Sequence, residues 1–248
     1  MMNLVFVRHG QSSWNKQNKF TGWVDVGLSE RGKSEAIEAG KVLKNLNFTP
    51  YICYTSFLKR SKDTASHVLN QLHIDNSFNT LKKEFWQLNE RHYGALQGLD
   101  KIETARKYGE DQVLKWRRGY EIKPPLIDQG SEFDPNLDDK YKDLNDEMPL
   151  GESLEDVVSR VKETLSIIVN TTKSGNVLVV AHGNSIRAMV KILEDISDKD
   201  IVDVNIPTGI PLAFNINDDK ITRIGYLGDK EKIQKLEDEV KQQSRLKE

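Results

Sequence analysis

The sequence has a single cysteine, Cys53, among 248 residues, so no disulfide can form within the chain. Cys53 lies in the apolar run 51–54 and is expected to be a small buried side chain rather than a nucleophile. No apolar run is long enough to span a bilayer, and the N-terminus lacks the basic and apolar pattern of a signal peptide. These absences predict a cytoplasmic protein with no membrane partner.

Neither sign of charge is in excess, because 36 Lys and Arg stand against 38 Asp and Glu and the net charge is −2. Without a global basic field, no nucleic-acid partner is expected. The glycine-rich fingerprints GxxxxGK(S/T) and GxGxxG of nucleotide-binding loops are missing. The five histidines lack the HExxH spacing and the cysteine neighbours typical of metal sites, so no metal is expected.

What the sequence does contain is the alternation of strands and helices that predicts a parallel sheet with crossover helices. The predicted strands are residues 4–7, 51–54, 80–85, 177–181, 212–217 and 221–226. Apolar positions at helical spacing predict helices over 30–46, around Ala65 to Leu72, after Ser153 and after His182. Ser29 is a predicted N-cap, and Ser153 with Asp156 resembles a capping box. The length suffices for a sizeable core, so residues 1–248 are predicted to form one three-layer α/β/α domain with a mostly parallel central sheet.

The alternation is interrupted between residues 95 and 148. Helical pieces are predicted over 101–108 and 111–118, followed by Pro124, Pro125 and an Asp-rich run. Long irregular segments within a compact domain are often lids, so an insertion packed over one edge of the domain is expected here. The charged stretch 229–248 is predicted to be a partly helical tail.

Two of the predicted strands end in His-Gly, at His9-Gly10 and at His182-Gly183. The carboxyl ends of parallel strands share one edge of a sheet, where ligands bind, so the two imidazoles are expected to meet over one crevice. A neutral imidazole can attack a phosphoryl group, and the adjacent Arg8 offers donors to anionic oxygens. Each histidine could instead be structural, but two of them beside an arginine favour phosphoryl transfer.

Ser56, Arg60 and Thr64 follow the second predicted strand at i, i+4 and i+8, on one side of a helix. Arg60 near the helix N-terminus would add a guanidinium where the helix dipole already favours anions. The alternative is a solvent-exposed arginine. His67 and His73, on or just after this helix, are expected to be structural or exposed.

Glu90 lies in a short loop and is a candidate general acid and base, the alternative being an ion pair with Arg91. Arg117 and Arg118 follow Trp116 within the insertion. They would be either a surface pair or a clamp on a phosphate or carboxylate.

Together these motifs resemble the histidine phosphatase superfamily, whose members carry RHG after the first strand. Within it, nearly the whole chain is similar to the cofactor-dependent phosphoglycerate mutases. The resemblance rests on RHGQSSWN (8–15), FTGW (20–23), LKR (58–60), LNERHYGALQG (88–98), WRRG (116–119), AHGNS (181–185) and NIPTG (205–209).

The resemblance implies that His9 is phosphorylated, that Glu90 transfers a proton and that His182 stabilises the transition state. It implies that Arg8 and Arg60 hold the transferred phosphoryl group. The implied substrate-binding residues are Arg8, Asn15, Thr21, Gly22, Arg60, Glu90, Arg91, Tyr93, Lys101, Arg117, Arg118, Gly183 and Asn184. A homodimer or homotetramer is also implied.

The implied reaction interconverts 3-phosphoglycerate and 2-phosphoglycerate in glycolysis and gluconeogenesis. It is primed by 2,3-bisphosphoglycerate and needs no metal. A bisphosphoglycerate synthase or phosphatase on the same scaffold is the alternative, although Ser12 resembles the mutases. Gln11 departs from the family, which usually has glutamate there, and so one negative charge near His9 is expected to be lost. The family's tail folds over the site, and the sequence does not decide whether residues 229–248 do the same.

Overall fold

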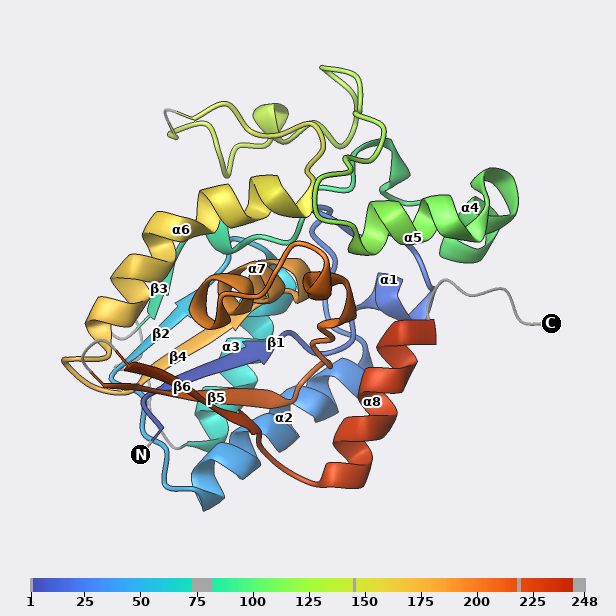
Figure 1. Ribbon diagram of the computed structural model, residues 1–248. Helices are drawn as coiled ribbons and strands as arrows, with labels where there is room; N and C mark the ends of the chain where they lie inside the picture. The colour runs from blue at the N-terminus through green and yellow to red at the C-terminus, as the bar shows by residue number, and fades with distance from the viewer. Residues whose placement is uncertain (1, 73–81, 145, 218–219, 243–248) are drawn as a thin grey trace.

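A computed structural model describes residues 2–72, 82–144, 146–217 and 220–242 (Figure 1). Its strands form one sheet in the order β3-β2-β4-β1-β5-β6. They are β1 (Leu4–Arg8), β2 (Ile52–Thr55), β3 (Lys82–Glu84), β4 (Val177–Ala181), β5 (Pro211–Asn217) and β6 (Lys220–Tyr226). The first four pair in parallel, whereas β5 and β6 are antiparallel at one edge. The predicted, mostly parallel sheet is confirmed; Thr80 and Leu81 of the third predicted strand lie outside the described residues.

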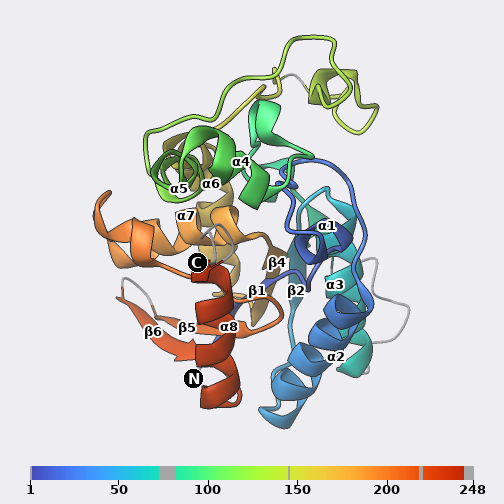
Figure 2. The same ribbon diagram turned by 90° about the vertical axis from the view of Figure 1, so that its right-hand side faces the viewer.

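The sheet is the middle of three layers because its strands are apolar on both faces. In β1, Leu4 and Phe6 pack in one core cluster with α6 (Leu154–Thr171) and α7 (Gly183–Glu194). The alternate residues Val5 and Val7 pack in a second cluster on the other side of the sheet. That cluster includes residues of α2 (Glu30–Asn45) and α3 (Lys59–Gln71). Figures 1 and 2 show the two helix pairs on opposite faces of the sheet, which confirms the predicted α/β/α architecture.

Hydrogen-bonding side chains begin two of the covering helices where the sequence predicts them. The Ser29 hydroxyl accepts from Gly32 N at 3.1 Å at the start of α2. At the start of α6, Ser153 and Asp156 form the predicted capping box. Such caps satisfy donors that would otherwise lack a partner in the first helical turn.

The interrupted region forms two short helices, α4 (Lys101–Tyr108) and α5 (Glu110–Arg118), and then irregular chain. Both predicted helical pieces are confirmed. Figure 1 shows this part, in green and yellow-green, outside the three layers. It packs through its own apolar clusters, one of which joins Val113 and Trp116 to Phe20.

The tail forms α8 (Lys230–Gln242), which confirms the predicted helical character; residues 243–248 lie outside the described residues. Ile233 and Leu236 of α8 pack against Ile210. An ion pair of 2.6 Å between Arg31 and Glu239 joins α8 to α2. Among the described helices, none has the length and apolar content needed to cross a bilayer.

The remaining helical elements are short: α1 (Ser13–Lys16) and the 3₁₀ turns η2 (Trp86–Leu88), η3 (Gly94–Leu96), η4 (Pro135–Leu137) and η5 (Asp200–Asp203).

Candidate active site

The carboxyl ends of β1 and β4 bring His9 and His182 together. The two strands are neighbours in parallel register, with Arg8 opposite Ala181. The backbone N–H of His9 donates to Ala181 O at 3.0 Å, which extends this pairing to the histidine itself. The ring centroids of His9 and His182 are 4.9 Å apart, and both side chains are buried. The expected meeting of the two imidazoles is therefore confirmed.

The hydrogen bonds of His9 determine which ring nitrogen carries its proton. Its Nδ1 lies 2.7 Å from Gly10 O, which can only accept, so Nδ1 must be the donor. The guanidinium Nε of Arg60 points at His9 Nε2 from 3.3 Å and can only donate, so Nε2 must carry the lone pair. Burial, Arg60 and Arg8 lower the pKa of His9 well below 6.5. His9 is thus a neutral imidazole with an available lone pair at neutral pH.

Glycine is required beside His9 because two backbones meet there. A Cβ at Gly10 would lie 2.1 Å from Gly32 O in α2, far inside van der Waals contact. Gly10 N donates to the Thr64 hydroxyl of α3 at 3.1 Å. The loop that carries His9 is therefore held by both helices on that face of the sheet.

Ser56, Arg60 and Thr64 all face the site, as their spacing predicts. The Ser56 hydroxyl lies 2.7 Å from His182 Nε2. The Arg60 guanidinium is buried and donates to Gly22 O at 2.7 Å and Val24 O at 3.0 Å. Burial lowers the pKa of Arg60 to about 10, so it remains charged at neutral pH.

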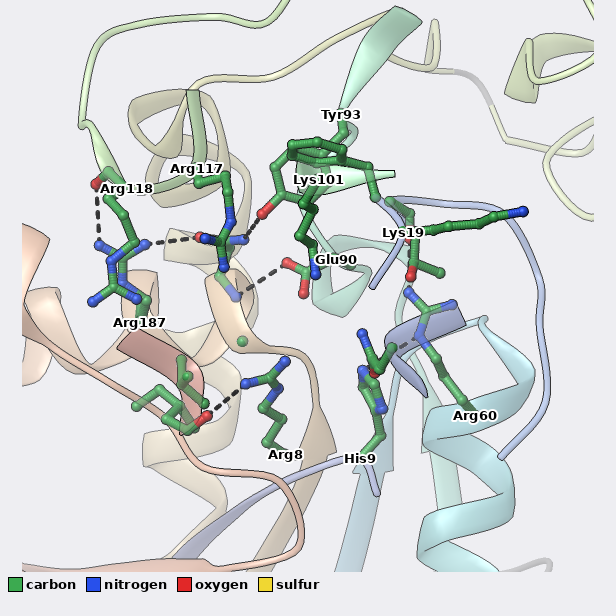
Figure 3. A pocket seen from close by; sticks show the side chains of 18 residues that line it. Arg8, His9, Lys19, Arg60, Glu90, Tyr93, Lys101, Arg117, Arg118 and Arg187 are labelled. Atoms are coloured by element: carbon green, nitrogen blue, oxygen red, sulfur yellow. Dashed lines mark hydrogen bonds between the residues drawn. The ribbon is translucent and has the colours of Figure 1, made fainter. Parts of the chain in front are cut away.

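Glu90 enters from the opposite side of the cavity, and its two carboxylate oxygens have different surroundings. Oε1 accepts from Arg91 N at 2.8 Å and from Asn184 N at 3.0 Å. Oε2 is not held by either of these main-chain donors. Figure 3 shows this carboxylate within the cavity, above Arg8 and His9. Oε1 is thus anchored, which leaves Oε2 free to exchange a proton. The alternative of a simple Glu90–Arg91 ion pair is not found, since Arg91 contacts it through the main chain.

Cations dominate the lining of this cavity. Seven basic side chains and one carboxylate, Glu90, line it. The basic residues are Arg8, Lys19, Arg60, Lys101, Arg117, Arg118 and Arg187. Burial is the main cause that lowers the pKa of Arg117 to about 10 and of Lys101 well below 10.5. Figure 3 shows Arg117, Arg118 and Arg187 on one side and His9 with Arg60 on the other.

Several buried N–H groups of the arginines have no hydrogen-bond partner among the described residues. They are Nε of Arg8 and Nε of Arg187, which line the cavity, and Nε and Nη2 of Arg91, which does not. Buried donors without a partner are costly, so they are expected to find acceptors when a ligand or water is bound. The site is suited to a small molecule with several anionic groups.

Most residues implied by the resemblance line the same cavity. Besides the basic side chains and Glu90, these are Asn15, Thr21, Gly22, Tyr93, Gly183 and Asn184. Arg91 does not line it: its guanidinium lies over the Tyr93 ring, 5.3 Å from the centroid, and donates to Gly119 O at 3.3 Å. His182 is buried beside His9 without lining the cavity.

The structure adds lining residues that the sequence does not single out: Lys19, Phe20, Arg187, Ile206 and Val240. Arg187 follows Asn184 by three residues on α7, and its Nη1 donates to the Asn184 Oδ1 at 2.9 Å. That spacing puts both on one helix face and is a signal in the sequence. Val240 belongs to α8, so the tail reaches the cavity.

The side chain of Gln11 is turned towards α2, where its Oε1 accepts from the Ser29 hydroxyl at 2.9 Å. A carboxylate is nevertheless close, because Glu35 accepts from Gln11 N at 2.8 Å.

Cys53 is buried as predicted, and burial raises the pKa of its thiol to about 12. Of the other histidines, His92 is buried and His67 is half-buried, whereas His73 lies outside the described residues. In the described part of the chain, no group of three or more His, Cys, Asp or Glu side chains could hold a metal ion.

Comparison with known proteins places the chain in a family. Residues 4–227 match the model of the histidine phosphatase superfamily (branch 1). The chain therefore belongs to the histidine phosphatase superfamily. A 2,3-bisphosphoglycerate-dependent phosphoglycerate mutase of Treponema denticola is 48% identical over 236 residues, which cover 94% of both chains. One from Lachnoclostridium phytofermentans is 46% identical over 249 residues, 99% of both chains.

Solved structures share the fold at lower identity. A mycobacterial glucosyl-3-phosphoglycerate phosphatase in complex with VO3 has a TM-score of 0.71 at 21% identity, covering 92% of this chain and all of that one. A structure described as mycobacterial hydrolase 1 has a TM-score of 0.67 at 22% identity, covering 92% of this chain and 98% of that chain.

Proposed function

We propose that this protein is a 2,3-bisphosphoglycerate-dependent phosphoglycerate mutase that interconverts 3-phosphoglycerate and 2-phosphoglycerate in glycolysis and gluconeogenesis. The observation that carries the proposal is a neutral imidazole whose Nε2 lone pair faces the cavity beside Arg60, with the Glu90 carboxylate across a cavity lined by seven basic side chains. The two phosphoglycerate mutases that are 46–48% identical over nearly their whole length support the choice of substrate.

Phosphoryl transfer begins at Nε2 of His9, whose lone pair forms the new bond to phosphorus as the bond to the leaving oxygen breaks. The Nδ1 proton remains on the ring and is held by Gly10 O, so the positive charge that develops on the imidazole is stabilised. A preformed hydrogen bond of 2.7 Å fixes the ring for this attack.

The surrounding donors act on the charge of the transferring group. Arg8 and Arg60 neutralise its equatorial oxygens without any change in their own protonation. When the Ser56 hydroxyl donates a hydrogen bond to Nε2 of His182, the ring proton is on Nδ1, and from there His182 can donate to the transferring phosphoryl group. Nδ1 is buried and without a hydrogen-bond partner among the described residues, as this role requires.

Glu90 accepts and returns the proton of the substrate hydroxyl. In one direction Oε2 takes the proton as the hydroxyl oxygen bonds to phosphorus and the phosphorus–His9 bond breaks. In the other direction it returns the proton to the departing oxygen. The anchored Oε1 keeps the carboxylate in one orientation for both steps.

The residues present also fit 2,3-bisphosphoglycerate, which supplies the phosphoryl group that primes His9. Arg117, Arg118 and Lys101 lie across the cavity from His9 and would hold the phosphate or carboxylate that does not react. A cytoplasmic location and an assembly of two or four copies remain predictions.

The proposal is tested by an assay that converts 3-phosphoglycerate to 2-phosphoglycerate in excess EDTA, with and without 2,3-bisphosphoglycerate, while phosphate release is followed in the same sample. Isomerisation that rises with the bisphosphate is expected. Phosphate release without isomerisation would overturn the mutase and leave a phosphatase that uses the same site.

A further inference from the structure

A buried ion pair lies next to the segment that carries Glu90. Arg160 of α6 donates from Nε to Glu152 Oε1 at 2.6 Å and from Nη2 to Glu152 Oε2 at 3.0 Å. The two side chains are only 8% and 3% exposed. Removing two charges from water is costly, and such a pair is often no more stabilising than apolar residues. Stabilisation of the fold alone therefore does not explain why this ion pair is buried here.

The arginine of this pair holds the backbone of the Glu90 loop. Arg160 Nη2 donates to the carbonyls of Asn89 and Glu90, both at 3.0 Å, and its Nη1 donates to Gln87 O. One planar guanidinium thus bonds three carbonyls within four consecutive residues. Arg160 bonds Glu152 as well, and the five donors of its planar fork permit this, whereas the three donors of a lysine ammonium cannot serve all these acceptors at once.

Two further groups complete the support on either side of Glu90. Glu152 Oε2 accepts from His92 N at 2.8 Å, just beyond the loop. Trp23 Nε1 donates to Glu90 O, the carbonyl that also accepts from Arg160. The Arg160 guanidinium lies 5.8 Å from the centroid of the Trp23 ring, within the range of a cation–π contact.

We propose that Arg160, held by Glu152, is the positioning residue for the proton-transferring carboxylate of Glu90. Neither residue lines the cavity, and their polar atoms are occupied by each other and by the main chain of residues 87–92, so they are not placed to bind the substrate. Their hydrogen bonds fix the main chain from residue 87 to 92, and this aims Oε2 into the cavity. The inference rests on the proposed function in one respect, because it takes Glu90 as the group that protonates the leaving oxygen.

The experiment compares the wild-type enzyme with R160K, which keeps a positive charge beside Glu152 but cannot bond Glu152 and all three carbonyls at once. E90Q is the reference for loss of the proton transfer itself. R223K is the matched control, because Arg223 forms an exposed ion pair with Glu194 at 3.2 Å away from the site. Thermal unfolding shows whether each variant is folded.

Two readouts separate positioning from general damage. The first is kcat and KM for isomerisation. The second is the single-turnover transfer of a phosphoryl group from 2,4-dinitrophenyl phosphate to His9, followed by the release of dinitrophenolate. This leaving group is acidic enough to depart without a proton, so the transfer does not need Glu90.

In R160K we expect kcat to fall about 10- to 100-fold, a part of the roughly 100- to 10,000-fold that general acid–base catalysis contributes, because Glu90 is displaced but still present. KM and the dinitrophenolate release should stay within about threefold of the wild type, the same pattern as in E90Q but weaker. Unchanged kcat, or an equal fall in both readouts, would overturn the proposal. Should R160K fail to fold, the comparison is made on E152Q, which keeps an oxygen for His92 N, and the same criteria apply.

Failure of the proposed function is distinguishable from failure of this inference. If the wild type releases phosphate from phosphoglycerate without isomerising it, the mutase proposal fails. The ratio of wild type to R160K is then measured on phosphate release, because the departing alkoxide needs a proton in that reaction too.

Discussion

The two sides of the cavity are built in different ways. On the histidine side, His9 and His182 stand at the ends of paired central strands, and each has a ring nitrogen hydrogen-bonded to the protein. On the arginine side, Arg117 and Arg118 come from α5 and Arg187 comes from α7. There, Nε of Arg187 is a buried donor with no hydrogen-bond partner among the described residues.

This difference separates chemistry from recognition. Attack on phosphorus requires a nucleophile fixed within a fraction of an ångström, which the sheet edge provides. Recognition of anions requires donors with spare hydrogen-bonding capacity, which the arginine side provides. We therefore expect substitutions on the histidine side to change kcat and substitutions on the arginine side to change KM.

The largest expected effect is that of H9A, which removes the proposed nucleophile. Isomerisation should fall by about four orders of magnitude or more, as is typical when a covalent catalyst is deleted. Binding of 3-phosphoglycerate, measured by calorimetry, should weaken less than about tenfold because the arginine side of the cavity is unchanged. A loss of binding as large as the loss of turnover would contradict the division between the two sides.

R117M is expected to have a smaller effect, and to change KM rather than kcat. Loss of one buried, charge-assisted donor should raise KM about 10- to 100-fold, since such bonds contribute roughly 1.5–3 kcal/mol. The transfer from 2,4-dinitrophenyl phosphate, which lacks the second anionic group, should change by less than about threefold. R106M serves as the control, because Arg106 lies on the solvent-exposed surface of α4 in an ion pair with Glu103. If R117M changed kcat alone, Arg117 would act in phosphoryl transfer and not in substrate binding.

Acid should destabilise the protein through its buried histidines. Burial is the largest cause that lowers the pKa of His9 and His182 well below 6.5, and of His92 to about 4. Below pH 6.5 the unfolded chain therefore binds more protons than the folded one, so stability falls as the pH drops. Each histidine should cost about 2 kcal/mol of unfolding free energy between pH 7 and pH 5.

The measurement is calorimetric unfolding at pH 5.5 in buffers of different ionisation enthalpy, which counts the protons taken up. An uptake of two to three protons is expected from these three side chains. Uptake below one proton would show that the rings are charged in the folded state, and the lone pair assigned to His9 Nε2 would then be wrong.

The smallest effect is expected for C53A, whose side chain lies in the core under α2 and α3 and does not line the cavity. Removing one buried sulfur should cost roughly 1 kcal/mol of stability and leave kcat unchanged. In the wild type, the thiol should react with a disulfide reagent only on unfolding, since burial raises its pKa to about 12. Rapid labelling of the folded enzyme would show that the α2–α3 face of the sheet opens more readily than the packing around β2 implies.

The same division explains what could be predicted from the sequence. His9, His182 and Arg8 are predictable because buried strands have a continuous apolar signal and their carboxyl ends share an edge. Arg60 follows from helical spacing, since Ser56 and Thr64 proved to face the same site. The periodicity of the sequence is sufficient to predict the position of a side chain wherever a helix or a strand determines that position.

Residues placed by tertiary packing are not predictable in this way. Spacing alone leaves Arg117 and Arg118 undecided between surface and site, because their position depends on how α5 packs beside Phe20. Arg160 shows no signal at all, since it lies about 70 residues from the Glu90 loop that it supports. Long-range contacts of this kind are seen only in the folded chain.

The central claim is that Nε2 of His9 accepts the phosphoryl group, and it is tested most directly by trapping that species. The enzyme is incubated with 2,3-bisphosphoglycerate, digested at alkaline pH to preserve phosphoramidates, and mapped by mass spectrometry, with ¹⁵N NMR to distinguish the two ring nitrogens. We predict one acid-labile phosphate per chain, on Nε2 of His9. A phosphate on any other residue, or on Nδ1 of His9, would contradict the account.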